Sequence, residues 1–221
     1  RDAYFIREKA VAGEIEAVQD LCVRGKRAEL QEAVKRAIAA GLSAQEIMAK
    51  GLIPAMSIVG GKYSSGEFFL PQMMIAARAM QEAVAVLKPL LAAGTYKTKA
   101  KAVLGTVAGD FHDIGKNIVK IMLEGAGYEV VDLGVDASPE KFVEAVRSVA
   151  PQFVLMSALI TLTMESMRKT VQALEAAGVR GAIMIGVGGA PLSQKFADEI
   201  GADFYGEDAY QCVEICNARL H

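Results

Sequence analysis

Residues 102–117 read AVLGTVAGDFHDIGKN, and this stretch decides how the C-terminal half of the 221-residue chain is expected to fold. The apolar run at 102–107 predicts a short buried strand. The polar run at 109–117 predicts a loop that opens a helix near 114–125. A strand, a polar loop and a helix in this order form one βα unit of an α/β protein.

The same order of strand and helix repeats toward the C-terminus. Further strands are predicted at 128–133, 153–156, 182–185 and 203–205. Further helices are predicted at 138–150 (capped by Ser138-Pro139-Glu140), 164–177, 192–200 and the C-terminal end. Buried strands that alternate with helices indicate a parallel sheet covered by helices on both faces. Five such units predict a flavodoxin-like, Rossmann-type domain with a five-stranded sheet at residues 98–221.

Residues 1–92 lack this alternation and read as helix throughout. One helical stretch, around Leu30 to Ile38, ends at Gly41, and Ser43 with Glu46 matches a capping box that opens the next helix. A third apolar stretch covers 51–63, and Pro71 stands at the first position of a long helix. Four or five helices with short connections predict an antiparallel bundle. Residues 92–98 are the expected linker and hinge between the two domains.

The rarest residues limit the chemistry that this chain can perform, because it has two histidines, three cysteines and no tryptophan. His221 is the last residue, so His112 is the only interior imidazole, which argues against zinc centres built on two or three histidines. Cys22, Cys212 and Cys216 form no Cys-x-x-Cys pair of a zinc ribbon. An odd and sparse set of cysteines fits a reducing compartment, which predicts a cytoplasmic protein.

Charge and hydropathy exclude two classes of partner. The net charge is −2, and broad binding to nucleic acid would need a concentrated basic face. Hydrophobic residues make up 52% of the chain, but no apolar run approaches the ~18 residues of a membrane span. We therefore expect neither nucleic acid nor a membrane among the partners.

The ligand of an open α/β sheet sits beyond the carboxyl ends of the strands, so the loop after the first predicted strand is a candidate site. This loop places His112 between Asp110 and Asp113. A neutral imidazole can ligate a metal through one nitrogen while its other N–H donates to a carboxylate, which fixes the tautomer. Gly115 would let a ligand approach closely. The alternative, that His112 is an ordinary loop or capping residue, is equally open at this point.

Two more predicted loops lie at the same edge of the sheet. The first, 157–163, carries hydroxyls that suit a polar ligand tail, although Thr161 or Thr163 could simply cap the next helix. The second, 186–191, reads GVGGAP and would let the backbone lie flat against a ligand. Its alternative is a tight turn into a helix opened by Pro191. Taken singly, both loops favour the alternative without a ligand.

A single interior histidine also restricts the kind of metal. One imidazole is a poor site for a free ion, but it is sufficient when a macrocycle supplies the equatorial ligands, as in haem or corrin. Haem would need an apolar slot with aromatic walls, which a hydrophilic loop at a strand end does not offer. The residues therefore favour a corrin over a haem.

Three ordered motifs carry a resemblance to a known family. Asp110-x-His112-x-x-Gly115, Ser157-x-Leu159 and Gly188-Gly189 resemble the signature of cobalamin-binding domains that bind the cofactor with a protein histidine in place of its lower base. The run at 109–119 is similar to that of cobalamin-dependent methionine synthase and of the small corrinoid proteins of methyltransferase systems. In the N-terminal half, 51–56 and 69–72 resemble the helical cap over the corrin. The resemblance spans nearly the whole chain.

The resemblance implies roles for individual residues. It implies that His112 is the lower axial ligand to cobalt, that Asp110 accepts from its other nitrogen, and that Thr163 completes the relay where methionine synthase has serine. It implies that Tyr63, where methionine synthase has phenylalanine, and Leu70 lie over the methyl face. The slot for the nucleotide tail would be lined by Asp113, Ile114, Gly115, Ser157, Leu159, Thr161, Gly188, Gly189 and Ala190.

The resemblance further implies a corrinoid methyl carrier, with methylcobalamin as its loaded state. Such a carrier is no complete enzyme: it would take a methyl group from a donor-specific methyltransferase and deliver it to an acceptor methyltransferase acting on tetrahydrofolate or a thiol. A reductive activase would be a third partner. Methanol, methylamines, betaines and aryl methyl ethers remain open as donors, because donor choice lies in the partner.

Three other interpretations compete with the carrier. A cobalamin-responsive sensor could share the cap and the α/β domain, but the chain shows no helix-turn-helix with a basic recognition face. The small subunit of an adenosylcobalamin mutase shares the histidine motif without a cap of this type. A flavodoxin-like domain with no cofactor would be colourless and would fail to bind hydroxocobalamin.

Overall fold

The computed structural model describes residues 2–92 and 98–220, and the side chains within 11–91 and 98–220. The chain divides into two compact units, one helical and one α/β, with the main boundary between residues 97 and 98, and Gly125–Gly127 group with the helical unit. Most of the predicted linker, 93–97, lies outside the described residues, as does His221. The predicted domain limits of 1–92 and 98–221 stay a prediction.

The first unit is built from helices alone, as predicted. They are α1 (Asp2–Val23), α2 (Arg27–Ala39), α3 (Ala44–Glu46), η1 (Ile47–Leu52), α4 (Ile53–Ser64) and α5 (Leu70–Ala92). The π-helical segment η1 joins α3 to α4 without a break, so the separately predicted stretches from 44 and at 51–63 form one continuous helix. The buried side chains of the helical unit include Leu30 and Val34 of α2, Leu52 of η1 and Met56 of α4.

The start of α3 confirms the predicted capping box. Ser43 Oγ accepts from the Glu46 N–H at 3.2 Å, and the Glu46 carboxylate accepts from the Ser43 N–H at 3.1 Å. Two main-chain donors that would lack partners at a helix start are thereby satisfied. The preceding turn contains Gly41 at φ 90°, a conformation that favours glycine, and this ends α2 as predicted.

The second unit is the predicted α/β fold with a fully parallel sheet. Its strands are β1 (Lys101–Thr106), β2 (Glu129–Asp132), β3 (Phe153–Ser157), β4 (Met184–Gly188) and β5 (Phe204–Gly206), in the spatial order β2-β1-β3-β4-β5. Its helices are α6 (Ile114–Gly125), α7 (Pro139–Val149), α8 (Met164–Ala176), α9 (Gln194–Ile200) and α10 (Ala209–Ala218), with the short 3₁₀ turns η2 (Thr161–Thr163) and η3 (Arg180–Ala182).

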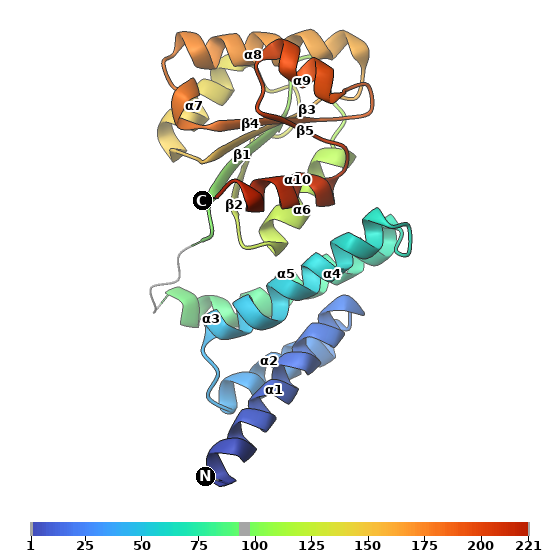
Figure 1. The fold of residues 1–221 in the computed structure, drawn as a ribbon, viewed down its shortest axis with the longest axis vertical. Coiled ribbons are helices and arrows are strands. Elements are labelled where there is room, and N and C mark those ends of the chain that lie inside the picture. Colours follow the sequence, from blue (N-terminus) through green and yellow to red (C-terminus); the bar gives the residue numbers. More distant parts are fainter. Residues whose placement is uncertain (1, 93–97, 221) are drawn as a thin grey trace. The chain divides into compact units, whose positions relative to one another are not determined.

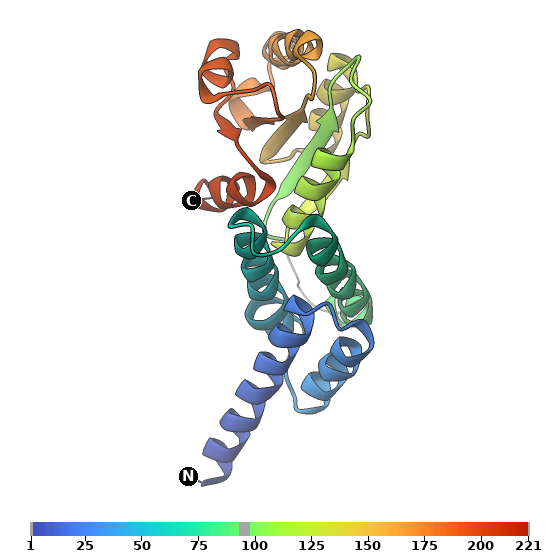
Figure 2. The same cartoon turned by 90° about the vertical axis from the view of Figure 1, so that its right-hand side faces the viewer.

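Helices cover both faces of this sheet. Helices α6 and α10 lie on one face, and α7, α8 and α9 lie on the other (Figure 1, Figure 2). The chain runs from β1 outward to β2 and then returns to β3 on the opposite side of β1. The connections after β1 and β3 therefore diverge, and a doubly wound sheet binds its ligands at such a point.

The fourth strand begins two residues later than predicted. Arg180–Ala182 forms a 3₁₀ turn, which Arg180 fixes by donating to the carbonyls of Ile183 at 3.1 Å and Gly201 at 2.8 Å. The strand accordingly covers Met184–Gly188, so Gly186 and Gly188 belong to β4 and not to a loop. The alternative in which Pro191 opens the next helix is also wrong, because Ser193 is the N-cap of α9.

None of the described helices combines the length and apolar character needed to cross a membrane.

Candidate functional site

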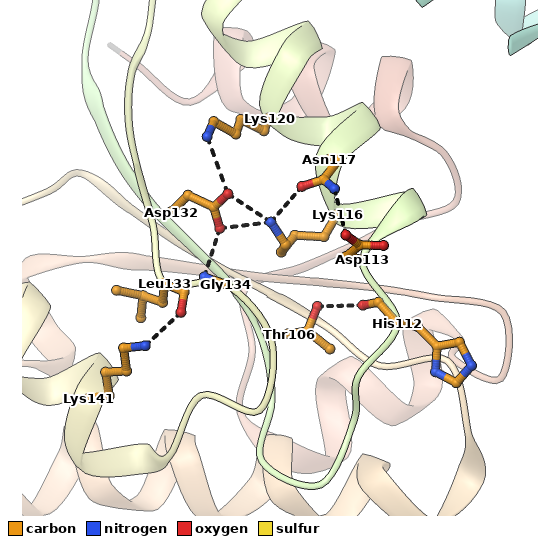
Figure 3. Close-up of polar contacts among 10 residues, drawn as sticks. All are labelled: Thr106, His112, Asp113, Lys116, Asn117, Lys120, Asp132, Leu133, Gly134 and Lys141. Atoms are coloured by element: carbon orange, nitrogen blue, oxygen red, sulfur yellow. Dashed lines mark hydrogen bonds and ion pairs between the residues drawn. The ribbon is translucent and has the colours of Figure 1, made fainter. Parts of the chain in front are cut away.

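His112 lies in the connection between β1 and α6, at the carboxyl edge of the sheet. Thr106, the last residue of β1, is fully buried, and its hydroxyl donates to the His112 carbonyl at 2.8 Å (Figure 3). From the connection after β2, the Asp136 carboxylate accepts from the Gly109 N–H at 2.7 Å, and the Asp136 N–H donates to the Asp110 carbonyl at 3.0 Å. The connection that carries His112 is therefore hydrogen-bonded to two neighbouring parts of the sheet.

The carboxylate of Asp110 is fully buried and has four donors. Its Oδ1 faces the ring Nδ1 of His112 at 2.7 Å and the N–H of the same residue at 3.0 Å. Its Oδ2 accepts from the Leu159 N–H at 2.7 Å and from the Thr163 hydroxyl at 2.8 Å. Asp110 thus joins the connection after β1 to the connection after β3.

These donors decide the ionisation of Asp110. Burial acts to raise the pKa of the carboxyl, but hydrogen bonds from the N–H groups of Leu159 and His112, the Thr163 hydroxyl and the His112 ring hold it well below its usual range. An ionised carboxylate can only accept, so Nδ1 of His112 must carry the proton. In the neutral imidazole, Nε2 then presents its lone pair, and the side chain is 53% exposed.

A cavity of about 640 Å³ opens beside His112 at the carboxyl ends of the strands. It is lined by Leu104, Phe111, His112, Asp113, Ile114, Gly115, Lys116, Val119, Leu155, Met156, Ser157, Leu159, Gly186, Val187, Gly188, Gly189, Ala190, Tyr205, Gly206, Glu207, Asp208, Ala209 and Cys212. The cavity lies entirely within the α/β unit.

Glycines line much of this cavity for two different reasons. At Gly189, φ is 137° and an added Cβ would lie 1.8 Å from the Ala158 carbonyl oxygen, so the close approach of two backbones requires glycine there. At Gly115 an added Cβ would meet nothing within 4 Å, so its absence leaves open space at the start of α6. The first glycine shapes the wall, and the second leaves room for a ligand.

Most of the residues predicted for the site are brought together here. Asp113, Ile114, Gly115, Ser157, Leu159, Gly188, Gly189 and Ala190 line the cavity with His112, and Asp110 and Thr163 lie behind the imidazole. Thr161, which was also predicted for the site, is not among the described residues that line the cavity. Thr163 stands at the N-cap position of α8, but its side chain makes no capping bond there and donates to Asp110 instead. Tyr63 and Leu70 belong to the helical unit, and their place over a corrin stays a prediction.

One wall of the cavity was not predicted from the sequence. Residues 205–209, which lead from β5 into α10, and Cys212 in α10 face the same space as His112. The parallel topology could have indicated this wall, because β5 ends at the same edge of the sheet as β1 and β3.

A buried ion pair under the first turn of α6 was not predicted from the sequence either. Lys116 is 3% exposed although it is charged, and its Nζ lies 2.7 and 2.8 Å from the two carboxylate oxygens of Asp132 and 2.7 Å from Asn117 Oδ1 (Figure 3). Burial raises the pKa of Asp132, but the hydrogen bond from Lys116 and the Gly134 N–H outweigh it and lower the pKa overall. The pair ties the start of α6 to the end of β2.

Comparison with known proteins decides the family. A family model described as a B12 binding domain matches residues 100–214, and a second model with the same description matches residues 14–88. The chain belongs to the B12-binding family. Cobalamin is therefore the cofactor of this corrinoid protein, as the motifs around His112 predicted.

Individual relatives are similar to this corrinoid protein over most of its length. It is 42% identical to the trimethylamine corrinoid protein of Methanosarcina barkeri over 86% of this chain and 89% of the relative. A cobalamin-binding protein from Desulfitobacterium hafniense has a similar solved structure (TM-score 0.77, 35% identity, 94% of this chain and 97% of that one). A chain in the solved structure of the methanol:cobalamin methyltransferase complex of Methanosarcina barkeri is also similar (TM-score 0.85, 32% identity, 94% of this chain and 80% of that one).

The residues of the site fit a corrinoid. The half-exposed ring of His112 lines the cavity, where the absence of a side chain at Gly115 leaves open space for a nucleotide tail. Phe111 and Ile114 are 70% and 67% exposed. These two large apolar side chains flank the pair His112-Asp113 in the sequence. Large exposed apolar groups around a binding site suit a flat and largely apolar ligand. Among the described residues, no three histidine, cysteine or acidic side chains cluster to hold a metal by themselves.

Proposed function

We propose that this chain is a methyl-carrying corrinoid protein that binds cobalamin with the lower base displaced and His112 in its place. When bound, the cofactor supplies the cobalt centre that carries the methyl group. The observation that carries the proposal is the setting of the imidazole: Nδ1 lies 2.7 Å from a buried carboxylate that has three other donors, which leaves Nε2 of the half-exposed ring as the nitrogen that can ligate.

The chain's own residues divide this work. His112 would offer the ligating nitrogen, and Asp110 would keep the proton of the neutral ring on Nδ1, because a ring that carries its proton on Nε2 cannot ligate through that atom. Thr163 and the Leu159 N–H hold Asp110 from the opposite side. The cavity lined by Gly115, Gly188 and Gly189 would take the displaced nucleotide tail.

The partners are inferred from the relatives. Because one similar solved structure is a methanol:cobalamin methyltransferase complex and a similar sequence is a trimethylamine corrinoid protein, we infer a donor-specific methyltransferase as the first partner. An acceptor methyltransferase for tetrahydrofolate or a thiol would be the second, and a reductive activase the third. The helical unit, with Tyr63 and Leu70, would shield the upper face of the corrin between encounters.

The identity of the lower ligand can be tested by isotope substitution. The protein is produced with ¹⁵N-histidine, loaded with hydroxocobalamin and reduced to Co(II), and its EPR spectrum is recorded. A histidine ligand would convert the three-line nitrogen splitting of each cobalt line into two lines, because ¹⁵N has spin one-half. A retained three-line pattern means that the cofactor's own base still binds cobalt, and it contradicts the proposal.

Two variants sharpen this experiment. His112→Ala should remove the two-line pattern, and His221→Ala should retain it, since these are the only histidines in the chain. The carrier role is tested separately with ¹³C-methanol and ¹³C-trimethylamine, each supplied with its methyltransferase. Label should appear on the protein-bound cofactor from one of the two donors, and failure with both would count against a carrier of methanol or trimethylamine methyl groups.

A further inference from the structure

Every hydrogen-bonding group of His112 except Nε2 has a partner among the described residues. The N–H donates to Asp110 Oδ1 at 3.0 Å, Nδ1 faces the same oxygen at 2.7 Å, and the carbonyl accepts from the Thr106 hydroxyl at 2.8 Å. The first two contacts come from within the connection itself, two residues away. Only the third ties His112 directly to the sheet.

Thr106 is a rigid anchor for that contact. It is fully buried and pairs with Ser157 of β3. Its N–H donates to the Gly134 carbonyl at 2.9 Å, and its carbonyl accepts from the Ala137 N–H at 2.9 Å. The main chain of Thr106 is thus bonded to the connection after β2, while its side chain reaches across to His112 (Figure 3).

The bond closes the connection on itself. The chain leaves β1 at Thr106, passes through Asp110, and returns at His112 to the hydroxyl of the residue from which it departed. Asp110 fixes the rotation of the imidazole relative to the connection, whereas Thr106, together with Asp136, fixes the connection relative to the sheet and its cavity. A ligating nitrogen needs both constraints, because a supporting residue that moves by a fraction of an ångström displaces the ligand atom with it.

We propose that Thr106 is a positioning residue for cobalt ligation, whose buried hydroxyl holds the main chain of His112 so that Nε2 meets the metal. This inference rests on the proposed function, since it assumes that His112 is the axial ligand. Thr106 touches no cofactor atom in this role and acts only through His112.

The test measures the affinity for cobinamide, a corrinoid without the nucleotide and its base, by absorbance titration of the apoprotein. Thr106→Val, which keeps the branched shape and loses the hydroxyl, should weaken binding about fivefold, the size expected for one hydrogen bond. Thr106→Ser keeps the hydroxyl and should stay within about twofold of the wild type. Thr170→Val is the matched control, because Thr170 is equally buried and also donates to a carbonyl, that of Ser166, at 2.8 Å.

A double-mutant cycle separates positioning from mere support of the fold. In a His112→Ala background the residue 112 carbonyl remains, so Thr106→Val still removes the hydrogen bond, but there is no imidazole to position. The fivefold loss should therefore disappear in that background. An equal loss in both backgrounds, or no loss in the wild-type background, would overturn the proposal. If Thr106→Val does not fold, Thr106→Ala compared with Thr106→Ser answers the same question.

The ¹⁵N experiment distinguishes this failure from a failure of the proposed function. If wild-type protein shows the two-line histidine pattern and the cycle shows no coupling, then Thr106 alone is wrongly assigned. If the wild type retains three lines, then His112 is not the ligand, and both proposals fall.

Discussion

The hydroxyl of Thr163 lies 2.8 Å from Oδ2 of Asp110, although 53 residues separate them along the chain. The Ile160 carbonyl is a second acceptor at 2.9 Å, but the single proton of the hydroxyl binds a carboxylate more strongly than a neutral carbonyl. The methyl group that distinguishes threonine from serine points toward Gly109, where an added Cβ would lie 3.6 Å away from it. Threonine is therefore accommodated at this position, since even an added Cβ at residue 109 would meet its methyl group at an ordinary van der Waals distance.

Removing this hydroxyl should weaken both the fold and the site. We expect Thr163→Val to lower the free energy of unfolding by about 1 to 2 kcal/mol, because a charged acceptor loses one of its donors. Urea denaturation measures the change. Thr163→Ser should stay within about 0.5 kcal/mol of the wild type, and a larger loss in Thr163→Ser than in Thr163→Val would show that the methyl group, rather than the hydroxyl, matters.

The ionisation of Asp110 predicts how the stability depends on pH. Its pKa is lower in the folded than in the unfolded state, where it is about 3.9, so the carboxylate stabilises the fold above pH ~4. That contribution is lost as the pH falls through the folded-state pKa. Asp110→Asn places an amide N–H against donors, so we expect it to lower the free energy of unfolding by about 3 kcal/mol at pH 7. The cost should shrink as the pH falls below about 4.

Urea denaturation at a series of pH values from 7 to 3 checks this expectation. The control is Asp198→Asn, an exposed carboxylate with one side-chain donor, Gln194. It should change the stability by less than about 0.5 kcal/mol at any pH. A difference between wild type and Asp110→Asn that is independent of pH would refute the assigned role of ionisation.

The ion pair under α6 predicts an unequal cost for its two members. In Asp132→Asn the Lys116 ammonium, whose side chain is 2% exposed, stays buried without a counter-charge, and we expect a loss of about 3 kcal/mol. Lys116→Met replaces the cation by an apolar chain of similar length and leaves Asp132 partnered by Lys120 at 3.3 Å, so the loss should be smaller. Lys120→Met should cost less than about 1 kcal/mol, since that side chain is partly exposed. Thermal unfolding of the three variants gives the order, and equal losses for all three would contradict it.

Two glycines of the cavity should respond oppositely to a single methyl group. Gly189→Ala drives Cβ into the Ala158 carbonyl and should destabilise the fold by several kcal/mol. Gly115→Ala meets nothing and lies in the first turn of α6, where alanine is up to about 1 kcal/mol better than glycine. It should therefore keep or raise the stability while it weakens cobalamin binding, because the methyl group enters space that the nucleotide tail would use.

The two assays for this pair are thermal unfolding of the apoprotein and absorbance titration with hydroxocobalamin. Unimpaired binding by Gly115→Ala would mean that the tail does not pass the start of α6.

The fold was predictable because its signals are local. Alternating apolar runs and helix caps such as Ser138 depend on neighbouring residues, so the parallel sheet and most element bounds followed from the sequence. The start of β4 did not, because an arginine bonding to the carbonyls of Ile183 and Gly201 holds residues 180–182 in a 3₁₀ turn. Side-chain bonds that stop a strand leave no trace in a hydrophobic pattern.

The candidate site was predictable in part. Asp110 and His112 are two residues apart, so their contact is a local matter that the motif itself contains. Thr163 entered only through the family resemblance. Thr106, Lys116 and the wall at 205–209 were missed, since nothing in the order of residues indicates which threonine or lysine will be buried against which partner.

The sequence by itself determined the class of fold, the single histidine available to a cofactor and the family to which the motifs belong. The tertiary structure alone decided how that histidine is held. Long-range contacts bring Leu159 and Thr163 to Asp110, and they thereby fix its charge, the tautomer of the imidazole and the open Nε2. The physical reason is burial: a carboxylate removed from water must find its donors wherever the folded chain brings them.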